Sequence, residues 1–389
     1  TDLEKKPLPV VERDLAAGPE GPRHTMSITA ALLYRRFQAG GAPIAMVSMD
    51  NCARNGEKLR AGVLSMARDW AERGLVESAF LDWLEDEGRV SFPWSMIDKI
   101  TPHPSERVQE ELGRLGVADM AIARTNTGTL IAPFVNAEIT EYLVEDAFPN
   151  GRPALEGAGV YLTDRTTVEK AEKMKVGTCL NPLHTALAVY GCLLGYTSIA
   201  AEMGDADLKA LVEHIAAESL PVVEDPGILS PRAFIDEVLH ERFPNPAIPD
   251  TPQRIAADTS QKLPVRYGGT LRRYARQSEQ ALAGLEFAPL VFAGWCRYLL
   301  GVDDRGNAMP VSPDPMLPQL QAHLKGIEVG RPDSLAGQLR PILSNAALFG
   351  VDLYAAGLGE RTEEMFRDML AGPGAVRATL HRNCACKQP

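Results

Sequence analysis

The short apolar run PIAMVSM at residues 43–49 decides the fold of the first part of the chain. It follows two glycines and has the length of a buried strand. Two further runs have the pattern of strands, TLIAPF at 129–134 and GVYLTD at 159–164. Helical periodicity fills residues 26–39, 57–73 and 76–87. Strands that alternate with helices predict an α/β fold for this portion.

The rest of the chain has a different pattern. Residues 1–25 are polar, contain Pro and Gly, and are predicted to form an extended lead-in. From residue 166 onward almost every long segment has helical periodicity, namely residues 166–175, 182–195, 206–218, 233–242, 252–262, 270–283 and 286–300. We therefore expect an α/β domain over residues 1–165 and a mostly α-helical domain over residues 166–389.

Length and charge exclude some classes of function. The 389 residues are too many for one ordinary core, which agrees with two domains. Lys and Arg number 40 and Asp and Glu 51, a net charge of −11. Without basic runs, such a chain is a poor candidate for binding nucleic acid or an anionic membrane. An anionic ligand would need a local concentration of positive charge.

The cysteines and the apolar segments indicate a cytoplasmic protein without a metal site. Six scattered cysteines fit a reducing compartment. The pair Cys384 and Cys386 lacks a second Cys/His pair at zinc-site spacing, so two free thiols are expected. The most apolar stretch, residues 179–196, is too short and too polar to span a bilayer. The first residues are charged and do not resemble a signal peptide.

No complete motif for phosphate binding or nucleophilic catalysis occurs in the sequence. The dinucleotide pattern G-x-G-x-x-G is absent, and its nearest match, Gly157-Ala158-Gly159, lacks the third glycine. The P-loop, H-E-x-x-H and G-x-S-x-G patterns are absent as well. Four local groups of polar residues remain as candidates.

The first group follows the predicted strand at 43–49. In D-N-C-A-R-N-G at 50–56, Asn51 stands where ligands collect in α/β sheets, at the carboxyl end of a strand. The alternative, which the residues alone favour, is that Asp50, Asn51 and Asn55 are turn and helix-capping residues.

The second group is S-F-P-W-S-M-I-D-K-I-T-P at 91–102. Asp98 interrupts an otherwise apolar loop there. Its alternatives are a pair with Lys99 or a cap on a turn, and the segment alone does not choose between them.

The third group joins Glu172 and Lys175 to N-P-L-H at 181–184. In a helix Glu172 and Lys175 are neighbours three residues apart. Asn181 is predicted to cap a new helix with Pro182 in its first position, which puts His184 in the first turn. The cluster offers an amine, an amide and an imidazole for proton transfer. The alternative is a surface ion pair followed by an ordinary capped helix.

The fourth group is T-P-Q-R-I-A-A-D-T-S-Q-K-L-P at 251–264. Thr251 and Pro252 predict a helix start, and Pro264 a stop or kink. Arg254, Asp258 and Lys262 then fall on one helical face, with the two cations about 12 Å apart. Spacing alone supports equally an anion site and a solvated ladder of ion pairs bridged by Asp258.

Together the four groups resemble the long-chain, zinc-independent polyol (mannitol) dehydrogenase family. The matches are D-N-x-x-x-N-G at 50–56, S-F-P-x-S-M-I-D-K-I-T-P at 91–102, N-x-x-H at 181–184 and D-T-x-Q-R-I-A-x-D-x-S-Q-K-L-P at 250–264. The longer motifs are specific, whereas N-x-x-H alone is not. TMSITAALLYRRF at 25–37, IAPFVNAE at 131–138 and MKVGTCLNPLHTALAVYGCLLGY at 174–196 look similar to the mannonate oxidoreductase (fructuronate reductase) branch.

The resemblance implies a Rossmann-like dinucleotide-binding domain, a helical substrate domain, and roles for eight residues. Lys175 matches the catalytic lysine, and Asn51 and Asn181 match the two amides that hold the developing oxyanion. Glu172 matches a carboxylate beside the lysine. The remaining matches are to substrate-binding residues, namely His184, Asp98, Arg254 and Lys262. Arg254 and Lys262 would suit the carboxylate of a uronate.

Two departures from the family pattern affect these expectations. The family spaces its lysine and asparagine as K-x-x-x-x-N, whereas Lys175 stands six residues before Asn181, one more than the pattern. Gly177 would absorb a bulge there, and Lys173 is the alternative lysine. The Gly-rich turn of the family is not found upstream of His24. We therefore expect residues 1–165 to be a partial Rossmann-like domain whose cofactor-binding residues are unknown.

The resemblance implies an NAD-dependent oxidoreductase that interconverts D-fructuronate and D-mannonate, a small-molecule sugar acid pair. The resemblance implies NAD as the cofactor, with NADP as the alternative, and no metal is expected. Other substrates of the same family, mannitol/fructose or tagaturonate/altronate, are the nearest alternatives. A non-catalytic relic of the fold is the alternative from another class of protein. The sequence determines no oligomeric state.

Overall fold

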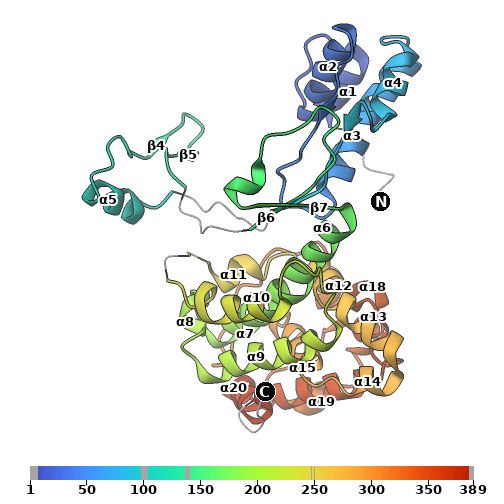
Figure 1. The fold of residues 1–389 in the computed structure, drawn as a ribbon. Coiled ribbons are helices and arrows are strands. Elements are labelled where there is room, and N and C mark those ends of the chain that lie inside the picture. Colours follow the sequence, from blue (N-terminus) through green and yellow to red (C-terminus); the bar gives the residue numbers. More distant parts are fainter. Residues whose placement is uncertain (1–7, 98–103, 136–140, 247, 249, 385–389) are drawn as a thin grey trace. The chain divides into compact units, whose positions relative to one another are not determined.

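The structure, a computed structural model, describes residues 8–97, 104–135, 141–246, 248 and 250–384 (Figure 1). The chain divides into two compact units. The first comprises Thr1–Thr101 and Asn136–Glu172, and the second Pro102–Val135 and Lys173–Pro389. The predicted fold class, an α/β portion followed by a mostly α-helical one, is confirmed.

The first unit carries short strands among longer helices. Its helices are α1 (Pro9–Ala17), α2 (Thr25–Gln38), α3 (Asn55–Glu72), α4 (Ser78–Glu85), the 3-10 helix η1 (Leu155–Ala158) and α6 (Arg165–Glu172). Its strands are β1 (Ile44–Ala45), β2 (Val90–Ser91), β3 (Ser95–Ile97), β6 (Tyr142–Glu145) and β7 (Val160–Thr163). β1 pairs in parallel with β2, while β6 runs antiparallel to β3 and parallel to β7.

Aromatic side chains make the core of the first unit. Trp70 and Phe80 are fully buried, and Trp83 is nearly so. Each tryptophan also satisfies its N–H: Trp70 donates to the carbonyl of Asp14 at 3.0 Å, and Trp83 to that of Gly41 at 2.9 Å. These bonds tie α3 and α4 to the segments before β1, and so position the loop that follows β1.

The prediction of an extended lead-in over residues 1–25 is wrong, because α1 lies within it. Pro9 stands at the start of this helix, where its missing N–H costs nothing. Val11 and Leu15, four residues apart, pack against the core of the unit. The buried carboxylate of Asp14 accepts the main-chain N–H of His24 at 2.7 Å. The sequence pattern did not predict this helix, because its apolar face consists of Val11 and Leu15 and charged residues surround them.

The strand predictions were right in place but too long for two of the runs. GVYLTD forms β7, as predicted. Only Ile44 and Ala45 of the run at 43–49 lie in a strand. The run at 129–134 contributes β5 (Leu130–Ile131), which pairs with β4 (Ala123–Arg124) close to α5 (Glu106–Arg114) in sequence. Because no residue of 104–135 is buried, these strands lack the packing that lengthens a sheet.

The second unit is built from helices apart from the β4–β5 pair. After α5 it contains the π-helix η2 (Lys173–Leu180), α7 (Asn181–Leu194), α8 (Ile199–Glu202), α9 (Ala206–Ser219), η3 (Leu220–Val222), α10 (Pro231–Glu237), the π-helix η4 (Val238–Arg242), α11 (Pro252–Ile255), α12 (Thr259–Arg266), α13 (Gly268–Gln277), α14 (Glu279–Ala283), α15 (Phe287–Tyr298), α16 (Leu317–His323), η5 (Pro332–Ser334), α17 (Arg340–Leu343), α18 (Ala346–Phe349), α19 (Gly359–Met369) and α20 (Ala375–Cys384).

Helices α7 and α15 form the centre of this unit. Nearly every residue of both is buried. The Tyr190 hydroxyl on α7 donates to the carbonyl of Leu290 on α15 at 2.8 Å. An added Cβ at Gly294 would lie 2.7 Å from the Tyr190 ring, so the two helices approach closely only because this residue is glycine. The first turn of α7 is thereby held on a rigid support.

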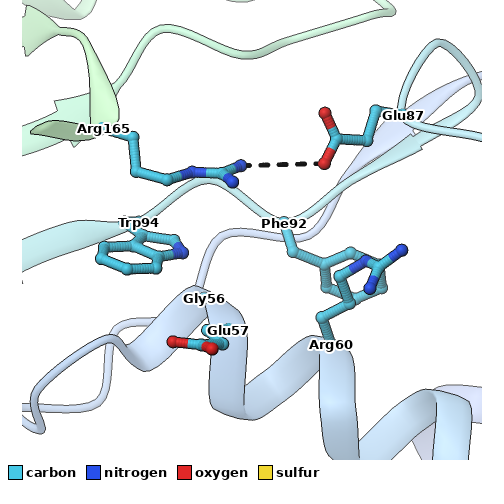
Figure 2. Close-up of a pocket in the computed structure, with 7 residues that line it drawn as sticks. All are labelled: Gly56, Glu57, Arg60, Glu87, Phe92, Trp94 and Arg165. Atoms are coloured by element: carbon cyan, nitrogen blue, oxygen red, sulfur yellow. Dashed lines mark ion pairs between the residues drawn. The ribbon is translucent and has the colours of Figure 1, made fainter. Parts of the chain in front are cut away.

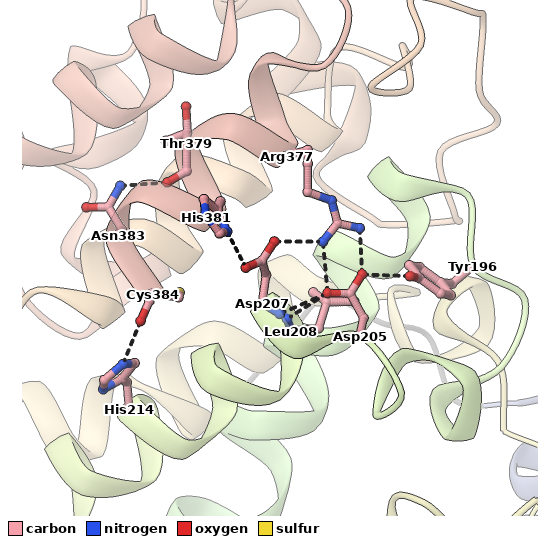
Figure 3. A network of polar contacts seen from close by, with 10 residues as sticks. All are labelled: Tyr196, Asp205, Asp207, Leu208, His214, Arg377, Thr379, His381, Asn383 and Cys384. Atoms are coloured by element: carbon pink, nitrogen blue, oxygen red, sulfur yellow. Dashed lines mark hydrogen bonds and ion pairs between the residues drawn. The ribbon is translucent and has the colours of Figure 1, made fainter. Parts of the chain in front are cut away.

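A polar network fixes the last helix, α20, to α9 (Figure 3). Asp205 caps α9 by accepting the N–H of Asp207 at 3.0 Å, and Arg377 of α20 binds Asp205 at 2.6 Å. The Tyr196 hydroxyl donates to the same carboxylate at 2.6 Å. Burial opposes ionisation, but these bonds outweigh it and lower the pKa of Asp205 to about 2. In the part of the chain that the structure describes, no helix is long and apolar enough to cross a membrane.

Candidate active site

The loop after β1 is organised by a buried asparagine. Asn55 donates from Nδ2 to Ser95 Oγ at 2.8 Å and to the carbonyl of Asp50 at 3.0 Å. Its Oδ1 accepts the N–H of Ser95 at 3.0 Å. An added Cβ at Gly56 would lie 2.5 Å from the carbonyl of Phe92. Asn55 and Gly56 of the motif at 50–56 therefore hold the loop against β3. Asn55 is more than a turn residue, because its side chain bonds Ser95 of that strand.

Asn51 lies in the same loop with its side chain exposed. Among the described residues its carboxamide makes no hydrogen bond. Arg54, at the end of the loop, has a left-handed backbone with φ of 54°. Its N–H reaches Glu172 Oε2 at 3.3 Å, and its guanidinium binds Glu169 at 2.8 Å. Helix α6 thus holds the loop through two carboxylates, while Asp98 falls outside the described residues.

A hollow of about 250 Å³ lies beside this loop (Figure 2). The Arg165 guanidinium sits over the Trp94 ring, 5.5 Å from its centroid, and pairs with Glu87 at 3.9 Å. Arg60 and Glu57 add one charge of each sign. Because the charges of the lining balance, the hollow offers no preference for an anion. None of the predicted site residues lines it.

Lys175 lies in a π-helix of the second unit. Its side chain is only 3% exposed, and Nζ stands 4.4 Å from the centre of the Phe234 ring of α10. Lys173, the alternative, has a side chain that is 45% exposed and lies 4.0 Å from Glu224. The two lysines therefore differ sharply in environment: one amine is buried against an aromatic face, and the other is near solvent and a carboxylate.

The prediction that Asn181 caps a new helix is wrong. The π-helix η2 leads directly into α7, so helical backbone passes through Asn181 without a cap. Pro182, which has no N–H, stands where the hydrogen-bond register changes and is tolerated there. The Asn181 carbonyl accepts the Thr185 hydroxyl at 2.9 Å, while its half-buried carboxamide makes no hydrogen bond within the described residues.

His184 stands in the first turn of α7, as predicted, and meets a carboxylate that the sequence did not single out. Its Nε2 lies 3.3 Å from Asp250 Oδ2, and its ring packs on Phe243 at 5.1 Å between centroids. Burial lowers the pKa of His184 despite this carboxylate. Burial alone would raise the pKa of Asp250, but His184 and Arg254 outweigh it and hold that pKa below its usual value.

The single helix predicted over residues 252–262 is wrong, since the chain breaks between α11 and α12. Asp258 has a left-handed backbone, φ 53°, and its N–H donates to Pro313 at 2.8 Å. Thr251 caps α11 as predicted, but α12 continues past Pro264. Arg254 binds Asp250 through Nε at 2.7 Å instead of bridging to Asp258. The ladder of ion pairs is therefore absent from these residues.

Lys262 folds back onto the helix before it. Nζ donates to the carbonyl of Ile255, the last residue of α11, at 2.8 Å and to that of Ala257, two residues further, at 2.5 Å. Burial, followed by the positive charges of Arg266 and Arg254, lowers the pKa of Lys262 to about 8. The helices that carry the predicted residues of this unit pack together, with α7 against η2, α11 and α12.

The loop after β1 presents exposed Met49, Asp50 and Asn51 at the carboxyl end of a parallel strand pair, where α/β sheets bind ligands. The carboxylate and amide in this loop are groups that can bind ligand hydroxyls, whereas the sequence supplies no Gly-rich turn of the kind that binds the phosphates of a dinucleotide. Across the described ranges no group of three His, Cys, Asp or Glu residues is arranged to hold a metal.

Comparison with family models gives two matches that together span most of the chain. Residues 14–157 match the mannitol dehydrogenase Rossmann domain, and residues 167–361 match the mannitol dehydrogenase C-terminal domain.

Individual relatives agree with these models. D-mannonate oxidoreductase of Thermotoga maritima is 56% identical over 96% of this chain and 69% of its own length. Mannitol 2-dehydrogenase of Aspergillus fumigatus is 33% identical over 89% of this chain and 63% of its own. The solved ternary complex of Pseudomonas fluorescens mannitol 2-dehydrogenase with NAD and D-mannitol is similar with a TM-score of 0.67 at 29% identity, covering 98% of this chain and 70% of that one.

Proposed function

Because the chain belongs to the mannitol dehydrogenase family, and so is an oxidoreductase that acts on CH–OH groups with a cofactor of the NAD type, we propose that it interconverts D-fructuronate and D-mannonate. The observation that carries the proposal is the 56% identity to D-mannonate oxidoreductase over 96% of this chain. The mannitol 2-dehydrogenases lie well below that value, at 33% for the Aspergillus fumigatus protein.

In the proposed reaction NAD(H) supplies or accepts the hydride, and the protein moves the accompanying proton. We assign that step to Lys175, whose Nζ gives a proton to the nascent alkoxide in reduction and removes it from the hydroxyl in oxidation. Burial is one of the means by which enzymes prepare a lysine for general acid–base catalysis. The burial of Lys175 against Phe234 supports this choice, and the exposure of Lys173 disfavours the alternative.

The π-helix supports the same assignment by accounting for the extra residue between Lys175 and Asn181. An α-helix bonds residue i to i+4, and a π-helix bonds i to i+5, so each π turn holds about one residue more. Six residues in η2 therefore rotate about as far as five residues in an α-helix. Lys175 and Asn181 are thus separated by about the same rotation around the helix axis as in the family spacing K-x-x-x-x-N, although one more residue lies between them.

We assign the carboxamides of Asn181 and Asn51 to the oxyanion that forms as the carbonyl is reduced. Amide donors fixed at the position of developing charge typically lower a barrier by about 3 kcal/mol each. Both carboxamides are without a hydrogen-bond partner in the described part of the chain, which leaves their donors for a substrate. The assignment of Asn51 rests on the motif at 50–56.

The remaining residues are assigned to substrate orientation. A neutral His184 that donates from Nε2 to Asp250 keeps Nδ1 as an acceptor for a substrate hydroxyl. Arg254, Lys262 and Asp98 are assigned to the substrate pocket, and Glu172 to the path of the proton, on their motif matches.

The finer proposals concern cofactor and location. We propose NAD rather than NADP, no metal ion, and a cytoplasmic location. The scattered cysteines support the last point, because Cys52, Cys179, Cys192, Cys296 and Cys384 are all free.

The test is NADH consumption by the purified full-length protein with D-fructuronate, D-tagaturonate and D-fructose side by side, each repeated with NADPH. The proposal predicts the highest kcat/KM for fructuronate with NADH. Highest activity with fructose would favour a polyol dehydrogenase, and with tagaturonate an altronate-forming enzyme. No activity with any of them would favour a non-catalytic relic.

A further inference from the structure

Arg266, at the end of α12, has fewer hydrogen-bond acceptors around it than its guanidinium has N–H donors. One guanidinium nitrogen donates to the Thr185 hydroxyl at 2.6 Å, and within the described residues no carboxylate pairs with it. A guanidinium carries five N–H donors. The side chain is half-buried, so water does not fully replace the missing partners. An uncompensated positive charge in a protein of net charge −11 calls for an anionic ligand.

Arg297 shows what a structural buried arginine of this protein does instead. Its guanidinium is fully buried and donates to the carbonyls of Met369, Val302 and Asp303 at 3.2, 2.6 and 3.2 Å. Burial lowers the pKa of both arginines to about 10, so both remain charged at neutral pH. Only Arg297 has its donors occupied by main chain.

Arg266 lies at the part of the second unit that carries the assigned residues. Thr185, which accepts from Arg266, donates to the carbonyl of Asn181 at 2.9 Å. The hydroxyl of Tyr267 donates to the carbonyl of Pro182 at 2.7 Å. These two bonds anchor the end of α12 on the first turn of α7, the turn that bears Asn181 and His184.

The other cations of this region are already engaged. Arg254 is bound to Asp250, which neutralises it, and Lys262 donates to two main-chain carbonyls. The charge of Arg266 adds to the lowering of the pKa values of His184 and Lys262 that burial begins, which marks it as their neighbour. Among the described cations of this group, Arg266 is therefore the one that has neither a carboxylate nor a second acceptor.

We propose that Arg266 binds the carboxylate of the sugar-acid substrate and so makes the site select uronates and aldonates over neutral sugars. This inference rests on the function proposed above and names the residue that sets its substrate class. A planar guanidinium matches a carboxylate with two parallel N–H···O bonds, which a neutral ketose or polyol does not offer.

The test compares wild-type protein with Arg266→Gln, Arg266→Lys and the charge-matched control Arg276→Gln, an exposed position in α13. D-mannonate and D-mannitol affinities are measured by calorimetry with NADH present, because NADH cannot oxidise either alcohol, and kcat/KM is measured with fructuronate and fructose. Arg266→Gln is expected to weaken D-mannonate binding about 10- to 100-fold, and to lower kcat/KM for fructuronate equally, mainly through KM. D-mannitol affinity, fructose turnover and the thermal unfolding midpoint stay unchanged.

Arg266→Lys keeps the positive charge but loses the planar guanidinium that makes two parallel hydrogen bonds. Its D-mannonate affinity should therefore lie between those of wild type and Arg266→Gln. It serves as the informative variant should Arg266→Gln unfold. Unchanged D-mannonate affinity in the Arg266 variants, or a wild-type protein that binds no D-mannonate, would overturn the inference. Binding that depends on Arg266 without turnover of any sugar acid would instead overturn the proposed function and leave the carboxylate site standing.

Discussion

His184 Nε2 lies 3.3 Å from Asp250 Oδ2, although 66 positions separate the two residues in the sequence. Both side chains are mostly buried, at 16% and 12% exposure, and Arg254 binds the other oxygen of the same carboxylate. One aspartate thus holds an imidazole on α7 and a guanidinium on α11. The orientation of His184 therefore depends on Asp250, which lies in the loop before α11, and substitution of Asp250 tests this dependence.

Asp250→Asn should raise KM for fructuronate and destabilise the protein by about 1–3 kcal/mol, because it removes the charge that the mostly buried His184 and the exposed Arg254 share. Since the pKa of Asp250 is below its usual 3.8 in the fold, the carboxylate stabilises the protein above that pH and loses this effect as the pH falls below it. Steady-state kinetics and unfolding between pH 2.5 and 7 measure both. Asp236→Asn, exposed on α10, is the charge-matched control. Equal behaviour of the two variants would contradict this role.

Lys175→Met should lower kcat by about 10²- to 10⁴-fold, the usual range for losing a general acid or base. Methionine keeps the contact with the Phe234 ring, so the unfolding midpoint should hardly change. Lys173→Met, at an exposed position, should keep near-normal turnover. If Lys173→Met proves to be the inactive variant, the catalytic lysine has been wrongly assigned.

Asn51 and Asn55 should separate activity from stability. Asn51→Ala removes an exposed donor and should lower kcat about 10²- to 10³-fold without moving the unfolding midpoint. Asn55→Ala leaves the buried N–H of Ser95 without its acceptor and should cost about 1–3 kcal/mol of stability. Paired kinetics and thermal unfolding decide the matter. Loss of stability in Asn51→Ala with full activity would reverse the two assignments.

Glu202 should make the stability of the protein fall as the pH rises, which is the opposite of the effect of Asp250. Its carboxyl is fully buried against Gly191, without a hydrogen-bond partner among the described residues, and burial raises its pKa from 4.5 to about 9. The folded protein therefore loses stability as the pH rises from about 4.5 to 9. Glu202→Gln should be more stable than wild type at pH 8, by on the order of 4 kcal/mol, and similar to it at pH 4. A constant difference across this range would refute the assignment.

Periodicity predicted the long helices because their burial is one-sided or complete along the whole length. α2, α3, α9 and α15 each lie close to their predicted ranges. Short elements escaped prediction, since α1 carries its apolar stripe on Val11 and Leu15 alone. The π-helix η2 escaped because hydrogen-bond register leaves no trace in residue types, although the one-residue excess between Lys175 and Asn181 was its signature.

The break at Asp258 was unpredictable from spacing, because its causes lie far along the chain. The Ser260 N–H and hydroxyl bind the carboxylate of Asp314 at 2.8 and 2.5 Å, and the Asp258 N–H binds Pro313. These bonds break the helix between Arg254 and Lys262, so Arg254 binds Asp250 while Lys262 binds main-chain carbonyls. The same tertiary contacts explain why Asp250 and Arg266 were missed: each stands at the edge of a motif and gains its role only from contact with α7.

Deuterium transfer from labelled NADH shows whether this protein reduces D-fructuronate to D-mannonate. The full-length protein is incubated with D-fructuronate and NADH that carries deuterium at the transferable position, and the product is examined by NMR. We expect D-mannonate with deuterium on the newly formed carbinol carbon, and loss of this product in Lys175→Met. Absence of labelled D-mannonate from the wild-type reaction, while D-fructose yields labelled mannitol, would contradict it.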